Sequence, residues 1–249
     1  MNPKISIIIP VLNNLTRLKK TIDSIKNQTF RDYEVFVIDG YSDLKTQEFL
    51  QNLTAPFFYQ SEKDKGVYDA MNKGISLSKG EWLFFLGAGD EFFNDATLED
   101  IFKNTKLEKN SIITGNVTYK AESKPFVYSK YKTEKKPIWS YKMWFWNGLH
   151  HQGTFYKREL FLKNQYCLKY KTLSDYHLNL RLYKEKKNCK ILNFTITKCN
   201  SDGLSKSGKW DLYKEEIELK TNLSSSFYTP FFYLVAGIKF ITRKIVNGR

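Results

Sequence analysis

The first hundred residues of the chain alternate between short, continuous apolar runs and longer segments with apolar residues at helical spacing. The apolar runs occupy residues 4–10, 33–39, 56–60 and 81–87. The segments between them occupy residues 15–28, 43–52 and 68–78. Continuous apolar runs predict strands covered on both faces, and spacing such as that of Leu15, Leu18 and Ile22 predicts helices. This order predicts an α/β fold, with a Rossmann-like, mainly parallel sheet and helices on both of its faces.

The alternation stops after about residue 105. Residues 111–120 and 188–199 have the composition of strands, and residues 174–185 have leucines at positions that fit a helix. A stretch rich in lysine, tyrosine and tryptophan lies between them, with no internal repeat and no low-complexity linker. We therefore predict that residues 1–105 and 106–222 are two halves of one domain, and that the second half packs onto the sheet of the first.

Residues 223–249 form a third segment with a different character. The run from Phe227 to Thr242 is largely apolar. This run is shorter than the roughly 20 residues that a membrane-spanning helix needs. The segment also contains Lys239, Arg243, Lys244 and Arg249 and no acidic residue. This combination predicts a helix or hairpin that lies on an anionic membrane surface. The alternative is a terminal helix that packs into the core.

Composition narrows the class of protein. The chain has 249 residues, of which 41% are hydrophobic and 16% aromatic, so it can bury a full core. Its three cysteines have no metal-type spacing, and their odd number fits a reducing, cytoplasmic compartment. The first residues lack the features of a secretory signal peptide, so secretion by that route is not expected.

The net charge of +14 is distributed unevenly along the chain. Residues 1–100 carry 11 lysines and arginines against 15 aspartates and glutamates, whereas residues 101–249 carry 29 against 11. This asymmetry predicts that the second half faces an anionic partner: a nucleic acid, a phospholipid surface or a phosphorylated substrate. A solvated, lysine-rich surface without a partner is the alternative.

Candidate chemistry lies at the ends of the predicted strands, because ligands of open α/β sheets bind at the carboxyl ends of strands. These ends are Pro10–Asn13, Asp39-Gly40 and Gly87–Asp90. The chain has neither a GxGxxG motif after its first strand nor a GxxxxGK[ST] motif, so dinucleotide and P-loop sites are disfavoured. Asp90 is either the N-cap of a following helix or a metal ligand at the mouth of a nucleotide site.

The order of several motifs resembles glycosyltransferase family 2, whose fold is of the GT-A type. The resemblance covers residues 4–206 and rests on "ISIIIPVLNN", "VIDGYSD", "EKDKGVYDAMNKG", "FFLGAGDEF", "HHQGTFYKRELF", "SDYHLNLRL" and "DGLS". Each motif alone is a weak signal, and their order together is specific. The resemblance implies that residues 1–105 bind a nucleotide sugar and residues 106–222 face the acceptor.

The resemblance also assigns residues to the donor. The base and ribose would lie at Pro10, Val11, Asn13 and Asp39, where a carboxylate suits the N3–H of uracil; for Asp39 the alternative is a turn at a strand end. The rest of the donor would lie along Lys65, Gly66, Tyr68, Asn72, Ala88, Gly89 and Gly203. Among these, Asn72 fits equally a structural role in a helix, and Gly203 lies in a loop where backbone would approach phosphate closely.

Asp90 and Asp175 are the residues that the resemblance assigns to metal and catalysis. Asp90 occupies the position of the family's paired carboxylates, but Gly89 precedes it, so one carboxylate and a diphosphate would have to hold Mn²⁺ or Mg²⁺. His151 is a second candidate at the metal or diphosphate, with an aromatic-pocket histidine as the alternative. Asp175 would be the general base at the start of a helix, where the alternative is a helix cap.

The sequence therefore predicts an inverting glycosyltransferase that moves a sugar from a nucleoside-diphosphate donor, expected to be UDP-linked, to a hydroxyl of a saccharide. The resemblance implies capsule, exopolysaccharide or O-antigen synthesis. The acceptor would be lipid-linked, for example through undecaprenyl pyrophosphate, and the enzyme would lie on the inner face of the plasma membrane. A nucleotidyltransferase, a non-catalytic scaffold of the same fold and a nucleic-acid binder are the competing hypotheses. We expect no nucleic-acid partner, because the chain has no recognised binding module.

Overall fold

A computed structural model describes residues 2–107, 109–120, 133–200 and 208–247. The first half forms the predicted parallel strands, which pair in the order β3-β2-β1-β4. These strands are β1 (Ile5–Val11), β2 (Tyr33–Asp39), β3 (Phe57–Ser61) and β4 (Trp82–Phe85). The connecting helices are α1 (Leu15–Lys26), α2 (Leu44–Gln51) and α3 (Val67–Leu77). All seven elements lie within about two residues of the predicted ranges.

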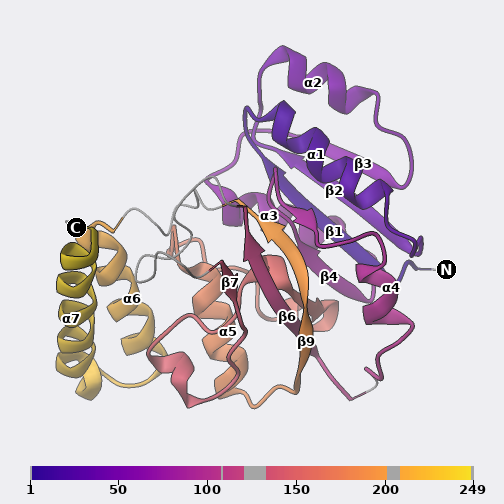
Figure 1. Cartoon of the computed structure of the whole chain (residues 1–249). Coiled ribbons are helices and arrows are strands. Elements are labelled where there is room, and N and C mark those ends of the chain that lie inside the picture. Colours follow the sequence, from indigo (N-terminus) through magenta and orange to yellow (C-terminus); the bar gives the residue numbers. More distant parts are fainter. Residues whose placement is uncertain (1, 108, 121–132, 201–207, 248–249) are drawn as a thin grey trace.

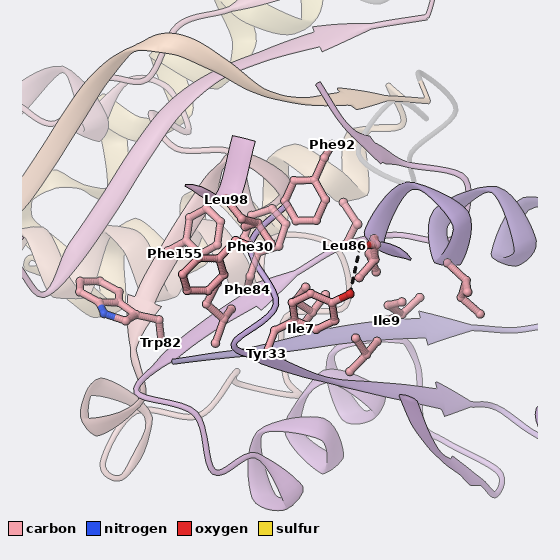
Figure 2. Close-up of a cluster of buried hydrophobic side chains, with 14 of the residues drawn as sticks. Ile7, Ile9, Phe30, Tyr33, Trp82, Phe84, Leu86, Phe92, Leu98 and Phe155 are labelled. Carbon is pink, nitrogen blue, oxygen red and sulfur yellow. Dashed lines mark hydrogen bonds between the residues drawn. The ribbon is translucent and has the colours of Figure 1, made fainter. Parts of the chain in front are cut away.

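Helices cover both faces of this sheet, as the continuous apolar strands require. Ile7 of β1 packs in the same buried cluster as Leu18 and Ile22 of α1. Its neighbour Ile8 points to the other face, into a cluster with Met71 of α3. Figure 2 shows the first cluster, in which the rings of Phe84 and Phe155 stack with centroids 4.1 Å apart. The core therefore joins residues from both halves of the chain.

The strands that follow β4 in the chain extend the same sheet. The full order is β3-β2-β1-β4-β8-β6-β9-β5, and β7 pairs with β6 beside this path. β8 is antiparallel to both β4 and β6, while β6 and β9 are parallel, so this part of the sheet is mixed. The strands are β5 (Glu91–Phe92), β6 (Ile112–Tyr119), β7 (Glu134–Lys135), β8 (Thr154–Lys157) and β9 (Cys189–Cys199). The α/β class with a mainly parallel first half is confirmed.

The remaining helices lie between these strands or after them. They are α4 (Thr97–Phe102), α5 (Ser174–Lys184), α6 (Trp210–Leu223) and α7 (Thr229–Asn247), with short 3₁₀ turns η1 (Tyr141–Trp144), η2 (His151–Gly153), η3 (Arg158–Phe161) and η5 (Ser226–Tyr228). The pair of α6 and α7 lies side by side at one edge of the molecule (Figure 1). Within the described ranges, none of the helices combines the length and the apolarity needed to cross a bilayer.

The predicted basic cluster of the C-terminal segment is only partly a surface feature. Lys239 donates to Glu216 at 2.5 Å and to the carbonyl oxygen of Phe145. Arg243 is 9% exposed, whereas Lys244 is exposed. Arg249 lies outside the described residues. The expectation that all four cations face the surrounding medium is therefore wrong for Lys239 and Arg243, because the packing of α7 on α6 turns them inward.

Candidate active site

Asp175 lies in the first turn of α5, at the position that the sequence predicted for a general base. Its side chain is surrounded by hydrogen-bond donors from three other segments. Oδ1 lies 3.1 Å from the Tyr68 hydroxyl and accepts from the N–H of Tyr176 at 2.7 Å. Oδ2 lies 3.2 Å from Nδ1 of His151 and 3.4 Å from Nδ2 of Asn147. The carboxylate is therefore held in one orientation.

These donors keep the buried carboxylate ionised. Burial raises the pKa of Asp175, but the hydrogen bond and charge of His151, with smaller contributions from the Tyr176 N–H and the Tyr68 hydroxyl, outweigh it. The net pKa lies below its ordinary value. The positive end of the α5 dipole acts in the same direction. An ionised carboxylate can accept a proton, which a capping role alone would not require.

Asp90 lies in the tight turn that follows β4, where its backbone N–H donates to the carbonyl of Gly87 at 2.9 Å. Its Oδ1 accepts from the N–H of Asn200 at 2.8 Å, and its Oδ2 accepts from Nε2 of Gln152 at 2.8 Å. The helix that follows begins only at Thr97, and Asn94 bonds its first residues. Asp90 is therefore not a helix N-cap.

Two adjacent residues of η2 connect these carboxylates. His151 contacts Asp175 of the second half, and Gln152 contacts Asp90 of the first half. η2 itself is anchored to β9, since the Thr197 hydroxyl donates to the carbonyl of Gln152 at 2.7 Å. The "HQ" dipeptide thus fixes the positions of the two acids relative to each other.

A cavity of about 390 Å³ opens at this point, at the carboxyl ends of the strands. Its walls include Pro10, Tyr68, Gly87, Tyr119, Lys135, Asn147, His151, Gln152, Lys171, Asp175 and Asn200. A hollow of about 500 Å³ at the opposite ends of the strands, around Lys4 and Trp82, contains neither Asp90 nor Asp175. Because ligands of open α/β sheets bind at the carboxyl ends of strands, we assign the chemistry to the first cavity.

The surroundings of Asp90 fit a hard cation that is shared with a diphosphate. The buried Gln152 Oε1 has no hydrogen-bond partner among the described residues, and it belongs to the amide that contacts Asp90. Burial raises the pKa of Asp90, and the Asn200 and Gln152 hydrogen bonds offset this only in part, so a cation would favour its charged form. Oxygen atoms of these kinds are the ligands that Mg²⁺ prefers. No group of three or more His, Cys, Asp or Glu side chains gathers in the described ranges, so further ligands would come from the donor.

On the donor side, Asp39 is fully buried, and its oxygens accept bonds from serines. Oδ2 accepts from the Ser61 hydroxyl at 2.6 Å and the N–H of Ser42 at 3.0 Å, while Oδ1 accepts from the Ser42 hydroxyl. A Cβ added to the next residue, Gly40, would lie 2.8 Å from Oδ2 of Asp64, which is half-buried. A carboxylate next to this strand end that still has an accessible side chain is Asp64, which lies in the "DKGVYDAMNKG" segment that the resemblance places along the donor. A contact between Asp39 and a base stays a prediction.

The segment around α3 divides into structural and accessible residues. The Asn72 amide bonds both the N–H and the carbonyl of Tyr166, each at 2.9 Å, so the structure gives Asn72 a structural role. Gly66, with φ of +124°, caps α3 and donates to Asp64 at 2.9 Å. Lys65 is exposed beside it. Tyr68 is buried, and its hydroxyl faces Asp175 rather than the end of β2.

The other predicted donor residues within the described ranges lie at the end of β1 and in the loops that follow β1 and β4. Pro10 lines the cavity and Val11 is buried. Asn13 joins the loop after β1 to the loop after β2, since its N–H donates to the Ser42 hydroxyl at 2.7 Å and its side chain accepts from the N–H of Asp43. Ala88 and Gly89 belong to the turn that carries Asp90, and Gly89 has φ of +98° there. Gly203 lies outside the described residues. Ligand contacts of these residues stay predictions.

Comparison with known proteins identifies the family. The sequence profile of glycosyl transferase family 2 matches residues 6–190. The chain belongs to glycosyl transferase family 2. A PGL/p-HBAD biosynthesis glycosyltransferase of Mycobacterium bovis is 33% identical over 187 residues, which cover 73% of this chain and 70% of that protein. The poly(ribitol-phosphate) beta-N-acetylglucosaminyltransferase TarP of Staphylococcus aureus is 33% identical over 120 residues, covering 45% of this chain and 36% of that protein.

Solved structures show that this glycosyltransferase has the GT-A fold. Residues 1–349 of Staphylococcus aureus TarS in complex with UDP-GlcNAc match with a TM-score of 0.69 at 15% identity, covering 97% of this chain and 72% of that chain. The mannosyltransferase PcManGT of Pyrobaculum calidifontis, in complex with GDP-Man and Mn²⁺, matches with a TM-score of 0.65 at 17% identity, covering 96% and 74%. The family decides for glycosyl transfer over the nucleotidyltransferase and scaffold hypotheses.

Sequence reasoning missed several residues of the glycosyltransferase site. Asn147, next to the Asp175 carboxylate, carries no motif signal of its own. Lys135 and Lys171 line the cavity and bring positive charge to it. Glu215 of α6 accepts from the N–H groups of Thr172 and Leu173, immediately before α5. Only the general excess of lysine in the second half indicated such positive charge, and nothing in the sequence indicated Glu215.

Proposed function

We propose that this enzyme is an inverting glycosyltransferase that transfers a sugar from a UDP-linked donor to a hydroxyl group of a saccharide acceptor. The observation that carries the proposal is Asp175, a buried carboxylate that its neighbours keep ionised at the wall of the cavity. Transfer to a hydroxyl needs a base at that hydroxyl, and Asp175 has the protonation state for this role. His151 and Asn147 would hold its Oδ2 toward one side, leaving the carboxylate oriented for the incoming acceptor.

The number of carboxylates supports inversion. Among the described residues that line the cavity, Asp175 is the one acid. A double displacement with retention needs a second carboxylate as nucleophile, as the retaining glycosidases illustrate. Direct attack of the acceptor hydroxyl on the anomeric carbon needs only the base. The sugar bond to the diphosphate breaks as the new bond forms, and the acceptor proton moves to Asp175.

A divalent ion, Mn²⁺ or Mg²⁺, is the cofactor that we propose for the donor. Asp90 would hold it together with the diphosphate oxygens, and Gln152 would orient the Asp90 carboxylate. The ion would supply Lewis-acid stabilisation to the leaving diphosphate. Two findings support this assignment: the chain belongs to glycosyl transferase family 2, and the structural neighbour PcManGT was solved with Mn²⁺. Lys135 and Lys171 would add positive charge near the same phosphates.

The donor and acceptor classes are the finer part of the proposal. A uracil-containing donor is supported by TarS, whose structure was solved with UDP-GlcNAc, and by the carboxylates near the β2 end. A saccharide acceptor is supported by the exposed aromatic side chains of Tyr141 and Trp146, close in sequence to Asn147. We propose that this acceptor is carried on a lipid pyrophosphate at the inner face of the plasma membrane, in the synthesis of a surface polysaccharide.

Substitution of Asp175 tests the proposal. The Asp175→Asn enzyme should hydrolyse or transfer from UDP-sugars about 10²- to 10⁴-fold more slowly, while its affinity for UDP is unchanged. Asp211→Asn is the matched control, because Asp211 lies in the first turn of α6 and its side chain is 84% exposed. A panel of nucleotide sugars identifies the donor first. Near-normal turnover of Asp175→Asn would remove the base assignment, and turnover with GDP-sugars alone would correct the donor.

A further inference from the structure

One face of α7 is apolar and exposed along the whole helix. Its residues recur at intervals of four and three, starting in the turn η5, and their side chains are between 45% and 82% exposed. They are Phe227, Phe231, Leu234, Ile238, Ile241 and Ile245, and we call them the α7 outer face. A half-exposed large apolar side chain contributes on the order of 100 Å². The set therefore matches or exceeds the few hundred Å² that the largest patch of a monomer usually exposes, and such a patch marks an interaction site.

The outer face is not needed to hold α7 in place. The opposite face of the helix packs on α6, where Phe232 and Ala236 are buried against Tyr213 and Ile217. The Phe232 ring also stacks on Trp144, with centroids 6.3 Å apart. Because these contacts fix the helix, the outer face remains available to a partner. The sequence left open whether the C-terminal segment packs into the core or lies on a surface. In the structure, one face of α7 packs on the protein and the opposite face is apolar and exposed.

Two occupants fit an apolar face with this spacing: a second copy of the chain and a lipid bilayer. A paired helix would need complementary charges beside the apolar seam to set its register. The residues that flank the outer face on α7 are Pro230, Val235, Gly237, Thr242 and Lys244, which offer no such pairs. Moreover, residues 219–249 contain no acid and each chain carries a net charge of +14, so two copies would repel each other.

The same features favour an anionic bilayer. Aliphatic side chains of the outer face suit the acyl boundary, and Tyr228 and Tyr233, each 50% exposed, add the amphipathic rings that are enriched at membrane interfaces. Lys244 is exposed at the basic end of the helix. We propose that the α7 outer face lies in the headgroup boundary of an anionic phospholipid bilayer and holds this enzyme on the membrane surface.

The position of α7 connects this surface to the active site. Phe145 contacts Phe231 of the outer face, with ring centroids 6.1 Å apart, and its carbonyl accepts a hydrogen bond from Lys239. Two residues further along, Asn147 contacts Asp175. Trp146, between them, is 53% exposed. The docking face and the acceptor side of the cavity are thus joined by a segment of three residues. An acceptor carried on a lipid would reach Asp175 from the surface on which α7 lies.

The attachment would be mainly apolar, because Lys239 and Arg243 turn inward and contribute little to the surface charge. Binding to vesicles should therefore persist in part at high salt, in contrast to a purely electrostatic anchor, which is screened. An attachment through all four basic residues of the C-terminal segment would instead be lost at high salt.

Vesicle co-sedimentation of the full chain tests the proposal. The probe is a phosphatidylglycerol–phosphatidylcholine vesicle, without donor or acceptor. The wild-type enzyme should sediment, and the triple variant Leu234→Ser, Ile238→Ser, Ile241→Ser should partition at least tenfold less. The matched control carries Leu44→Ser, Leu162→Ser and Ile191→Ser, three exposed apolar residues away from α7, and should sediment like the wild type. In Figure 1, Leu44 begins the helix α2, at the opposite end of the molecule from α7.

Several results would overturn the docking proposal. One is that the wild type stays in solution when vesicles are present at low salt. Another is that the triple variant sediments with the vesicles as well as the control does. A wild type that is a dimer by ultracentrifugation and becomes a monomer in the triple variant would assign the face to a second copy. The purpose of the docking, access to a lipid-linked acceptor, rests on the proposed function. A failure of the proposed function can be told apart from a failure of the docking proposal, because vesicle binding is measured without turnover. Donor hydrolysis by the triple variant in solution should equal that of the wild type.

Discussion

Replacing Glu215 by alanine removes the side chain that holds the segment in front of α5. One carboxylate oxygen of Glu215 accepts from the N–H of Thr172 at 2.8 Å and from the N–H of Leu173 at 2.6 Å. Hydrogen bonds to a charged group contribute about 1.5–3 kcal/mol each, but Glu215 is half-buried, so water would replace part of them. We expect a loss of about 2–3 kcal/mol in the free energy of unfolding. For a domain of this size that corresponds to a fall of roughly 5–10 °C in Tm.

The same substitution should lower kcat, although Glu215 does not contact the cavity. Thr172 and Leu173 immediately precede the turn that carries Asp175, so their release would let the base move. A displacement of about 1 Å can cost on the order of 10²-fold in rate. The assay compares thermal unfolding, kcat and UDP affinity, and UDP affinity should be unchanged. Glu218→Ala is the control, because Glu218 lies on the same helix, is 45% exposed and forms an ion pair with the surface residue Lys169.

Unchanged Tm and kcat in Glu215→Ala would refute this reasoning. The segment would then be held by its other contacts, among them the bond from the Tyr68 hydroxyl to the carbonyl of Thr172 at 2.9 Å. An equal loss in Glu218→Ala would show that the effect belongs to α6 as a whole and not to the two hydrogen bonds.

The remaining predictions concern the two acids. Asp175 acts when deprotonated, and its pKa lies below the ordinary value. The kcat of the wild type should therefore stay constant as the pH falls, until the pH reaches that lowered pKa. Because His151 lowers the pKa, His151→Gln should move the acidic limb of the pH–kcat profile to higher pH; an unmoved limb would show that His151 does not tune the base. For Asp90, calorimetry should detect UDP binding that is strengthened by Mn²⁺ in the wild type and not in Asp90→Ala. Equal binding by both proteins, unaffected by EDTA, would remove the metal from Asp90.

The seven elements from β1 to β4 could be predicted because each of them carries one clear pattern of apolar residues. β1, β2 and β4 are buried on both faces and α1 has a single apolar stripe, so local pattern and tertiary environment agree. α6 was not predicted, since it packs in two directions: Leu219 enters the main core, whereas Tyr213 and Ile217 contact α7. Two apolar directions on one helix give no single stripe to recognise. β8 is a short strand without alternation, and only its neighbours define it.

The site could be predicted as a set of residues but not as a set of contacts. The end of β4 located Asp90 and the start of α5 located Asp175, since both follow from local signals. The contacts of His151 with Asp175 and of Gln152 with Asp90 depend on how η2 packs against β9. No local sequence pattern encodes this packing. The burial of Asp39 had a partial signal, because a serine three residues after an aspartate favours a local turn bond. Ser61, its other partner, lies on a different strand.

The insertion of β8 between β4 and β6 has a consequence for exchanging parts between related enzymes. A fragment that ends at residue 105 would lose the strand that covers the edge of β4, whose four residues are all buried. An uncovered, apolar strand edge is a template for aggregation, so such a fragment would be a poor recipient for a foreign acceptor half. Recombination of two family members therefore has its natural crossover outside the segment from β4 to β8. An exchange that keeps these two strands from one parent would keep the sheet closed, and with it the spacing between the donor and acceptor carboxylates.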